Sequence, residues 1–164
     1  MPESESGRLK NFRAAATMIK KGHEMQTESM EELEAEIRAD LDELSDPFSQ
    51  FTYLAECGKE LPECPERFRA EEYRIPECQV KTWAAAEQTD GVLHFYAWSE
   101  SMVVRGALDL IEEIYDGRKP EEVRQYSCGL LDDEDFRRHF TPEQRRGLKG
   151  ILDRISRAGG EIVE

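Results

Sequence analysis

The sequence predicts an α+β domain in which helices pack on one face of a small antiparallel sheet. Apolar residues recur at steps of three and four in the first and last thirds of the chain, which is the spacing of amphipathic helices. Between these parts, two short β-prone runs flank Asp90-Gly91, the strongest hairpin signal in the chain. A lone hairpin buries its apolar face by packing against helices, so the order helices, hairpin, helices indicates this fold class.

Length and composition indicate one domain with an N-terminal extension. A chain of 164 residues with 38% hydrophobic residues suffices for one core. Residues 1–26 mix acidic, basic and small side chains without a sustained apolar face, and we expect them to form a mobile extension. The single domain is predicted to span residues 27–160.

A helical hairpin is predicted to begin the domain. The apolar stripe of the first helix consists of Met30, Leu33, Ile37, Leu41 and Leu44. Asp46-Pro47 separates the two helices, because Asp is a favoured N-cap and Pro a favoured first helical residue. The second helix is expected to end near Gly58 and to direct inward Phe48, Phe51, Leu54 and Ala55.

The middle of the chain is predicted to be a surface loop followed by the β-hairpin. Three prolines between residues 61 and 76 prevent a long helix there. The strands are expected over residues 79–88 and 92–98. The hairpin carries four large aromatic residues, which we assign to the core of the domain: Trp83, Phe95, Tyr96 and Trp98.

The last part of the chain is predicted to be helical. Ser101 caps a helix that stops at Asp116-Gly117, and short helices follow from Pro120 and from Asp132. The segment 141–144, Thr-Pro-Glu-Gln, is a capping box with Pro at the first helical position. It opens a final helix whose core-facing residues are Leu148, Ile151, Leu152 and Ile155.

Charge narrows the range of partners. The 36 acidic and 22 basic residues give a net charge of −14, which disfavours nucleic acid and anionic membrane surfaces. No run approaches the roughly 18 consecutive apolar residues of a membrane span, and the N-terminus lacks a secretory signal. We therefore expect a soluble, cytoplasmic protein.

Four cysteines are the candidate reactive groups. They lack a C-x-x-C pair, which disfavours a metal site, and we expect reduced thiols. Cys57 and Cys128 are predicted to be packing residues, whereas Cys64 has acidic neighbours and is predicted to be exposed with a raised pKa. Cys78 lies where the proline-rich loop meets the first strand, so its thiol is placed to reach a partner. The residues alone leave open whether Cys78 is reactive or a packing residue.

Other catalytic arrangements have little support. The histidines are scattered, so no fixed base beside Cys78 is predicted. There is no phosphate-binding glycine motif, and nucleotide binding is not indicated. The three histidines are assigned structural or solvated roles: His23, His94 and His139.

Five segments together resemble the SufE family of sulfur acceptor proteins over residues 47–155. Their order and spacing match along that whole length, and the family fold is the same helices-on-sheet architecture. The segments are residues 53–58, Leu61-Pro62, residues 75–83, Val104-Arg105-Gly106 and residues 139–148.

The resemblance implies a role for Cys78. In that family, the cysteine of a G-C-Q-S-x-V-W segment receives sulfur from the persulfide of a pyridoxal-phosphate cysteine desulfurase. The matching residue is Cys78, and Gln79 and Trp83 are also kept. The resemblance further implies delivery of the sulfur to an iron–sulfur cluster scaffold, with no cofactor and no metal in the protein itself. Supporting positions carried over in the same way are Glu100 and Arg105.

Three positions depart from the family pattern. Glu77 replaces a glycine, which costs about 1–2 kcal/mol if the position needs a positive φ, and its charge should raise the pKa of the thiol. Val80 replaces a serine. Gln144 stands where the family has arginine, and Arg145 is the proposed substitute.

These observations lead to three functional hypotheses. The leading one is a sulfur acceptor that stimulates a cysteine desulfurase and carries sulfur on Cys78. The second is a SufE-like regulatory protein that docks on the desulfurase without carrying sulfur. The third is a thiol redox protein that uses Cys64 and Cys78.

Overall fold

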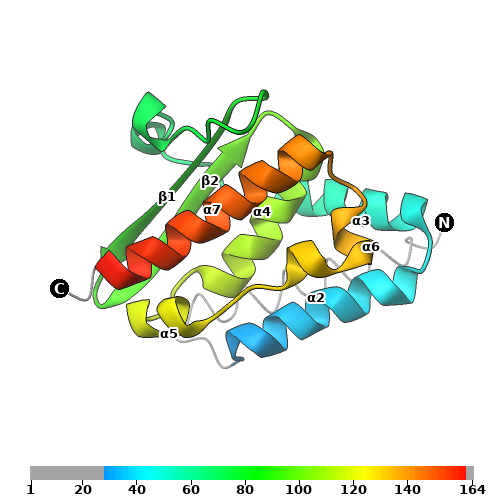
Figure 1. The fold of residues 1–164 in the computed structure, drawn as a ribbon, viewed down its shortest axis with the longest axis horizontal. Helices are drawn as coiled ribbons and strands as arrows, with labels where there is room; N and C mark the ends of the chain where they lie inside the picture. Colours follow the sequence, from blue (N-terminus) through cyan, green and yellow to red (C-terminus); the bar gives the residue numbers. More distant parts are fainter. Residues whose placement is uncertain (1–27, 162–164) are drawn as a thin grey trace.

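The computed structural model describes residues 28–161, so the extension predicted over residues 1–26 lies outside the described residues. Figure 1 shows the order of the elements along the chain. The hairpin and the long helices are α2 (Met30–Leu44), α3 (Pro47–Glu60), β1 (Thr82–Thr89), β2 (Val92–Ser99), α4 (Met102–Tyr115) and α7 (Pro142–Glu161). The short helices are the 3-10 turns η1 (Glu66–Phe68), η2 (Glu71–Tyr73) and η3 (Leu130–Asp132), with α5 (Pro120–Gln125) and α6 (Glu134–Arg137).

Local capping signals start the helices as predicted. The Asp46 side chain accepts a hydrogen bond from Ser49 N at 2.9 Å and begins α3 with Pro47 at the first position. At the start of α7, Thr141 N donates to Gln144 Oε1 at 2.9 Å while Gln144 N donates to Thr141 Oγ1 at 3.1 Å. This reciprocal pair is the predicted capping box.

The sheet is a two-stranded antiparallel hairpin. Its register runs from Thr82 opposite Ser99 to Thr89 opposite Val92. The connecting turn has φ of 54° at Asp90 and 83° at Gly91, the positive values that a tight two-residue hairpin turn requires. β1 begins at Thr82 and not at the predicted residue 79, because the chain bends at Gln79 and Val80.

Helices cover one face of this sheet, with α4 against β2 and α7 against β1 (Figure 1). The face that they cover carries the buried side chains of Leu93, Phe95 and Ala97. α3 packs on α4, and α2 contacts α4, α6 and α3. The fold is therefore α+β, with helices packed on one face of a small antiparallel sheet, as predicted.

The aromatic residues of the hairpin do not all enter the core, which corrects the prediction. Phe95 is 4% exposed, but Trp83, Tyr96 and Trp98 are only half-buried because they lie on the opposite face of the hairpin. The Phe68 ring of η1 stacks on Tyr96 with 4.8 Å between ring centroids. The proline-rich segment thus covers part of the second face.

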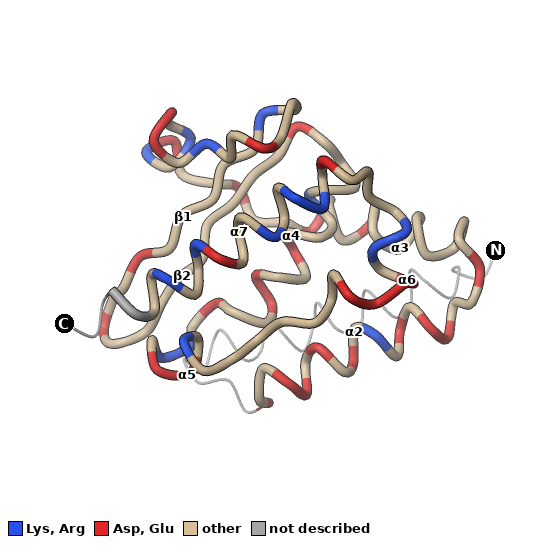
Figure 2. The backbone as a smooth tube through the Cα atoms, in the orientation of Figure 1, with Lys and Arg blue, Asp and Glu red and all other residues tan. Residues whose placement is uncertain are grey.

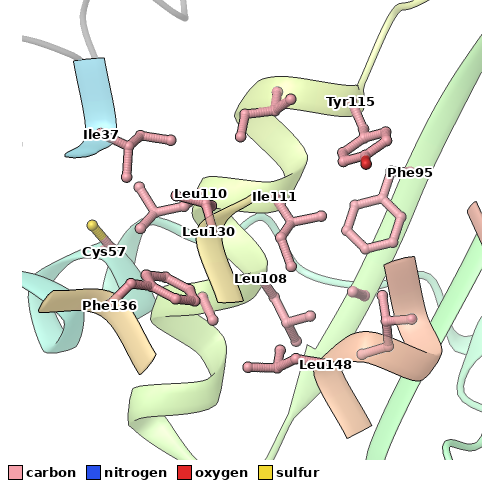
Figure 3. Packing of buried hydrophobic residues seen from close by; sticks show 14 of the residues in the cluster. Ile37, Cys57, Phe95, Leu108, Leu110, Ile111, Tyr115, Leu130, Phe136 and Leu148 are labelled. Atoms are coloured by element: carbon pink, nitrogen blue, oxygen red, sulfur yellow. The ribbon is translucent and has the colours of Figure 1, made fainter. Parts of the chain in front are cut away.

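The core is centred on α4. Leu108, Leu110 and Ile111 of this helix are at most 2% exposed. Figure 3 shows them among buried side chains from the other helices and β2, including Ile37, Cys57, Phe95, Leu130, Phe136 and Leu148. One hydrophobic cluster therefore joins the helical hairpin, the sheet and the C-terminal helices.

Two predictions for α3 are wrong. Phe48 is 80% exposed and Phe51 is 48% exposed, because the side of α3 that meets α4 is the one carrying Leu54 and Cys57. Gly58 does not end the helix, which continues to Glu60. Its missing side chain instead allows close packing on α4, since a Cβ there would lie 2.6 Å from Met102 O.

One short helix of the C-terminal half starts later than predicted. The helix predicted from Asp132 begins at Glu134, capped by the side chain of Asp133, while Asp132 belongs to η3.

Within residues 28–161, no helix is long and apolar enough to cross a membrane.

Candidate functional site

Cys78 closes a tight turn at the entrance to β1. Its backbone N–H donates to Ile75 O at 3.2 Å, and Ile75 N in turn donates to Thr82 O at 2.9 Å. Pro76 occupies the second turn position, where its fixed φ is favourable. Among the described residues other than glycine, only Ser45 and Asp90 have positive φ. Glu77 therefore replaces the family glycine without left-handed strain.

The Cys78 thiol points inward while its neighbours face solvent. Cys78 is 8% exposed, whereas Pro76, Glu77, Gln79 and Val80 are exposed. The sulfur lies against α7 at Gly147, where a Cβ would be only 2.3 Å from Cys78 Sγ. The absent side chain of Gly147 thus makes room for the thiol just beneath the surface.

The groups around the Cys78 thiol have opposing effects on its pKa. Burial raises the pKa of Cys78, and the negative charges of Glu77 and Glu143 raise it further. The nearby Thr82 hydroxyl acts in the opposite direction and lowers the pKa. Thr82 is itself held by Ser99, with 2.8 Å between the two hydroxyl oxygens. The thiol of the free protein is therefore stabilised in its protonated form.

Four of the predicted supporting residues lie at this end of the hairpin. Trp83 is half-buried in β1 and bridges to Arg74, and Gln79 is exposed in the turn. Exposed Glu100 donates its N–H to Lys81 O at 3.0 Å. Arg105 donates from Nε to Ser99 O at 2.5 Å, and its guanidinium lies 4.2 Å from the Trp98 ring centroid.

Arg145 has a different environment. It lies two residues from Gly147 on α7, and helical residues at that separation do not share a face. Its Nε donates to Phe140 O at 3.0 Å. Gln144 does share a face with Gly147, but its Oε1 accepts the capping hydrogen bond from Thr141 N. Both residues thus make their hydrogen bonds at the start of α7, and Arg145 as the substitute for the family arginine stays a prediction.

Three residues near the turn were not singled out from the sequence. The Thr82 hydroxyl lowers the pKa of the thiol, and Gly147 accommodates the sulfur atom. Arg154 donates from Nη2 to Arg74 O at 3.5 Å and so links α7 to the segment before the turn. The helical spacing from Gly147 to Arg154, seven residues, is the signal that places both on one side of α7.

The other cysteines occupy three different environments. Cys57 is fully buried, as predicted, and Cys128 is half-buried with a pKa raised to about 11 by burial. The prediction for Cys64 is wrong in its exposure, since this residue is only 2% exposed. Burial, rather than the neighbouring carboxylates, raises its pKa. Its side chain lines a cavity with Phe95, and no disulfide forms among the four cysteines.

The histidines that the structure describes have structural partners. The His139 Nε2 lies 3.1 Å from Gln50 Oε1, and His94 Nδ1 lies 3.4 Å from Asp116 Oδ1. In the described part of the chain, no three His, Cys, Asp or Glu side chains are grouped so as to hold a metal ion. The third histidine, His23, lies outside the described residues.

The fold and the site define a class: a small α+β protein that presents one cysteine in a surface turn against a helix glycine. Residues 35–158 match the SufE family, described as an Fe-S metabolism associated domain. The chain therefore belongs to the SufE family.

Individual relatives agree with this assignment. The uncharacterized SufE-like protein R01000 of Rhizobium meliloti (strain 1021) is 28% identical over 141 residues, covering 74% of this chain and 96% of the relative. The sulfur acceptor protein CsdE of Escherichia coli (strain K12) is 26% identical over 126 residues, covering 76% and 84%. The solution structure of a hypothetical protein from Thermus thermophilus has a TM-score of 0.58 at 22% identity, covering 77% and 95%. This last likeness concerns the fold.

Proposed function

We propose that this protein is a sulfur acceptor, which takes persulfide sulfur from a cysteine desulfurase on Cys78 and passes it on for iron–sulfur cluster assembly. The observation that carries the proposal is the position of Cys78 at the end of a turn, with exposed residues on both sides of it: Pro76, Glu77, Gln79 and Val80. Membership of the SufE family and similarity to a protein named as a sulfur acceptor support it.

The transfer is a thiol exchange between two proteins. The Cys78 thiolate attacks the terminal sulfur of the desulfurase persulfide, and a new S–S bond forms between Sγ and that sulfur. The S–S bond in the desulfurase breaks, and its cysteine leaves as a thiolate. No external oxidant or reductant is consumed, because the sulfane sulfur moves with its oxidation state unchanged. Removal of the persulfide frees the desulfurase for another turnover, which accounts for stimulation.

The resting geometry requires the thiol to turn outward before it reacts. Cys78 Sγ faces Gly147, and its pKa is raised by burial and by two carboxylates. Solvation of the thiol, together with a partner cation near it, would lower that pKa and yield the reactive thiolate. Docking of the desulfurase is the event to which we assign this change.

The persulfide on Cys78 is the form in which sulfur is carried onward. When the turn returns to α7, its contact with Gly147 would shield the Cys78 side chain from solvent. The receiving partner is an iron–sulfur cluster scaffold. We place the reaction in the cytoplasm, where reducing conditions keep thiols reduced.

Two other functions are weighed against this one. A regulatory protein that docks without carrying sulfur is favoured by the burial of Cys78, which protects the thiol from solvent. A redox pair of Cys64 and Cys78 is less favoured, because the two thiols pack differently. Cys64 lines a cavity with Phe95, whereas Cys78 packs on Gly147. A disulfide would require the two Cα atoms to come within about 7 Å.

The test is stimulation of a cysteine desulfurase, measured as alanine released from cysteine. Wild type and Cys64→Ser should both stimulate turnover, and Cys78→Ser should not. Equal stimulation by Cys78→Ser would support the regulatory protein and defeat the acceptor proposal. Loss of stimulation in both Cys64→Ser and Cys78→Ser would instead support the redox pair.

A further inference from the structure

Helix α7 carries arginines without acidic partners in a strongly acidic chain. The net charge is −14, yet α7 contains five basic residues and three acidic ones. Figure 2 shows these basic positions along α7, whereas α2 is mostly acidic. Arg146, Arg154 and Arg157 make no salt bridge with any of the residues described. Arginines that form no salt bridge in a chain with so many carboxylates can pair with an anion of another molecule.

These arginines form a stripe beside the Cys78 turn. Positions 146, 150 and 154 are spaced by four residues, and Arg157 follows three later, so all lie on one side of the helix. Gly150 leaves the middle of the stripe without a side chain. A groove of about 570 Å³ results, lined by Glu77, Gly150, Asp153, Arg154, Ser156 and Arg157.

The groove already contains a carboxylate of the chain itself. A Cβ at Gly150 would lie 3.5 Å from Glu77 Oε2, so the Glu77 side chain extends over α7 at this glycine. Its carboxylate nevertheless makes no salt bridge with Arg154 or Arg157. The groove thus accommodates a carboxylate but does not bind this one tightly.

We infer that the α7 groove docks an acidic segment of the protein that exchanges sulfur with Cys78, with carboxylates pairing to Arg154 and Arg157 where Glu77 lies in the free protein. The identity of this partner rests on the proposed function. Guanidinium groups bind carboxylates through two parallel hydrogen bonds, which matches the groove to acidic side chains. The acidic remainder of the surface repels such a segment and restricts it to this stripe.

Docking in the groove would be coupled to the thiol. Glu77 and Cys78 are adjacent in one turn, and their side chains lie over α7 at Gly150 and Gly147 respectively. An incoming carboxylate displaces Glu77, which withdraws the turn from the helix. The same movement takes a negative charge away from the thiol, which favours the thiolate.

The first test uses a hexaglutamate peptide titrated into the ¹⁵N-labelled full-length protein and followed by NMR. The peptide should shift the α7 amide signals and the Nε–H signals of Arg154 and Arg157 in a saturable way. Raising the salt should weaken binding several-fold, because exposed charges are screened. The double variant Arg154→Ala, Arg157→Ala should weaken peptide binding about tenfold. It removes two ion pairs with the peptide, and the loss of two such pairs lowers affinity by about that factor.

The control is Lys59→Ala with Arg137→Ala, which removes the same charge from α3 and α6. Retained binding in this control together with loss in the α7 variant supports the groove. Equal weakening in both double variants, or shifts spread over other surfaces, overturns it.

A second test uses a cysteine desulfurase and separates this inference from the proposed function. The α7 double variant should require about tenfold more protein for half-maximal stimulation than the control variant, with the maximum unchanged. An unchanged half-maximal concentration, with Cys78→Ser inactive, overturns the groove but not the acceptor function. If wild type itself does not stimulate, the acceptor function fails, and the peptide titration decides the groove alone.

Discussion

Gly106 and Gly147 both allow a close approach, but the groups that approach them differ. A Cβ at Gly106 on α4 would lie 2.1 Å from Leu54 O, a backbone atom of α3. A Cβ at Gly147 on α7 would lie 2.3 Å from Cys78 Sγ, the end of a side chain in a turn. Either added Cβ would clash severely. Helix α3 is part of the core, whereas the turn that carries Cys78 has solvent-exposed residues on both sides of the thiol.

The difference separates a contact between two core helices from a contact between a helix and the thiol of a surface turn. At Gly106, the glycine sets the distance between two helices of the core. At Gly147, the glycine makes room for the Cys78 thiol, which lies at the edge of the hydrophobic cluster and next to exposed residues. Substitutions at the two positions should therefore affect different properties.

The largest effect is expected for Gly106→Ala. The new Cβ has to push α3 and α4 apart, and overpacking of this kind costs about 3 kcal/mol of unfolding free energy. Urea denaturation measures the loss. Gly150→Ala is the matched control, because its Cβ meets nothing closer than 3.5 Å. It should gain up to about 1 kcal/mol from helix propensity. A loss below about 1 kcal/mol at Gly106 would mean that the helix pair is as adjustable as the turn.

Gly147→Ala should act on the thiol more than on stability. The Cβ displaces Cys78 Sγ and drives the turn outward, while the gain in helix propensity of about 1 kcal/mol offsets part of the strain. Stability should change little, and Cys78 should react several-fold faster with Ellman's reagent. A loss of stability as large as that of Gly106→Ala, with no change in reactivity, would remove the distinction between the two contacts.

A smaller effect is expected for Glu77→Gln. The charge of Glu77 raises the pKa of Cys78, so its removal lowers that pKa. The pH midpoint of Cys78 alkylation should therefore move to lower pH, and the rate at neutral pH should rise a few-fold. Glu72→Gln, an exposed neighbour in η2, serves as the control. A midpoint that stays in place or rises would contradict the assigned role of Glu77.

Thr82→Val should produce the smallest change and the opposite sign. Its hydroxyl lowers the pKa of Cys78, so the midpoint of alkylation should move to higher pH. Loss of the hydroxyl pair with Ser99 should also reduce the unfolding free energy by about 1 kcal/mol. Alkylation across pH and urea denaturation check the two parts. Faster alkylation would show that the hydroxyl blocks the thiol instead of stabilising its thiolate.

Local signals in the sequence predicted the fold well. Asp46, Thr141 and the Asp90-Gly91 turn act through their own backbone neighbours, so their consequences do not depend on the rest of the chain. The orientation of Phe48 depends on where α4 packs, and that contact is made by residues far apart in the sequence. The same reason explains Cys64, which lies among acidic neighbours but is buried in a cavity.

The place of Cys78 between the loop and β1 was predictable, but the geometry around its thiol was not. The family resemblance selected Cys78, while the inward direction of its thiol depends on Gly147, 69 positions along the chain. The expected strain at Glu77 is absent because the backbone there stays out of the positive φ region. The proposed substitution by Arg145 could not be judged from spacing alone, since it depends on which side of α7 meets the turn.

The central claim is that Cys78 receives the sulfur. The direct measurement is peptide mapping by mass spectrometry after incubation with a cysteine desulfurase and cysteine, without reductant. We expect one additional sulfur atom on the peptide that contains Cys78 and none on the peptides with Cys57, Cys64 or Cys128. Sulfur found on another cysteine, or found in equal amount in Cys78→Ser, would contradict the claim.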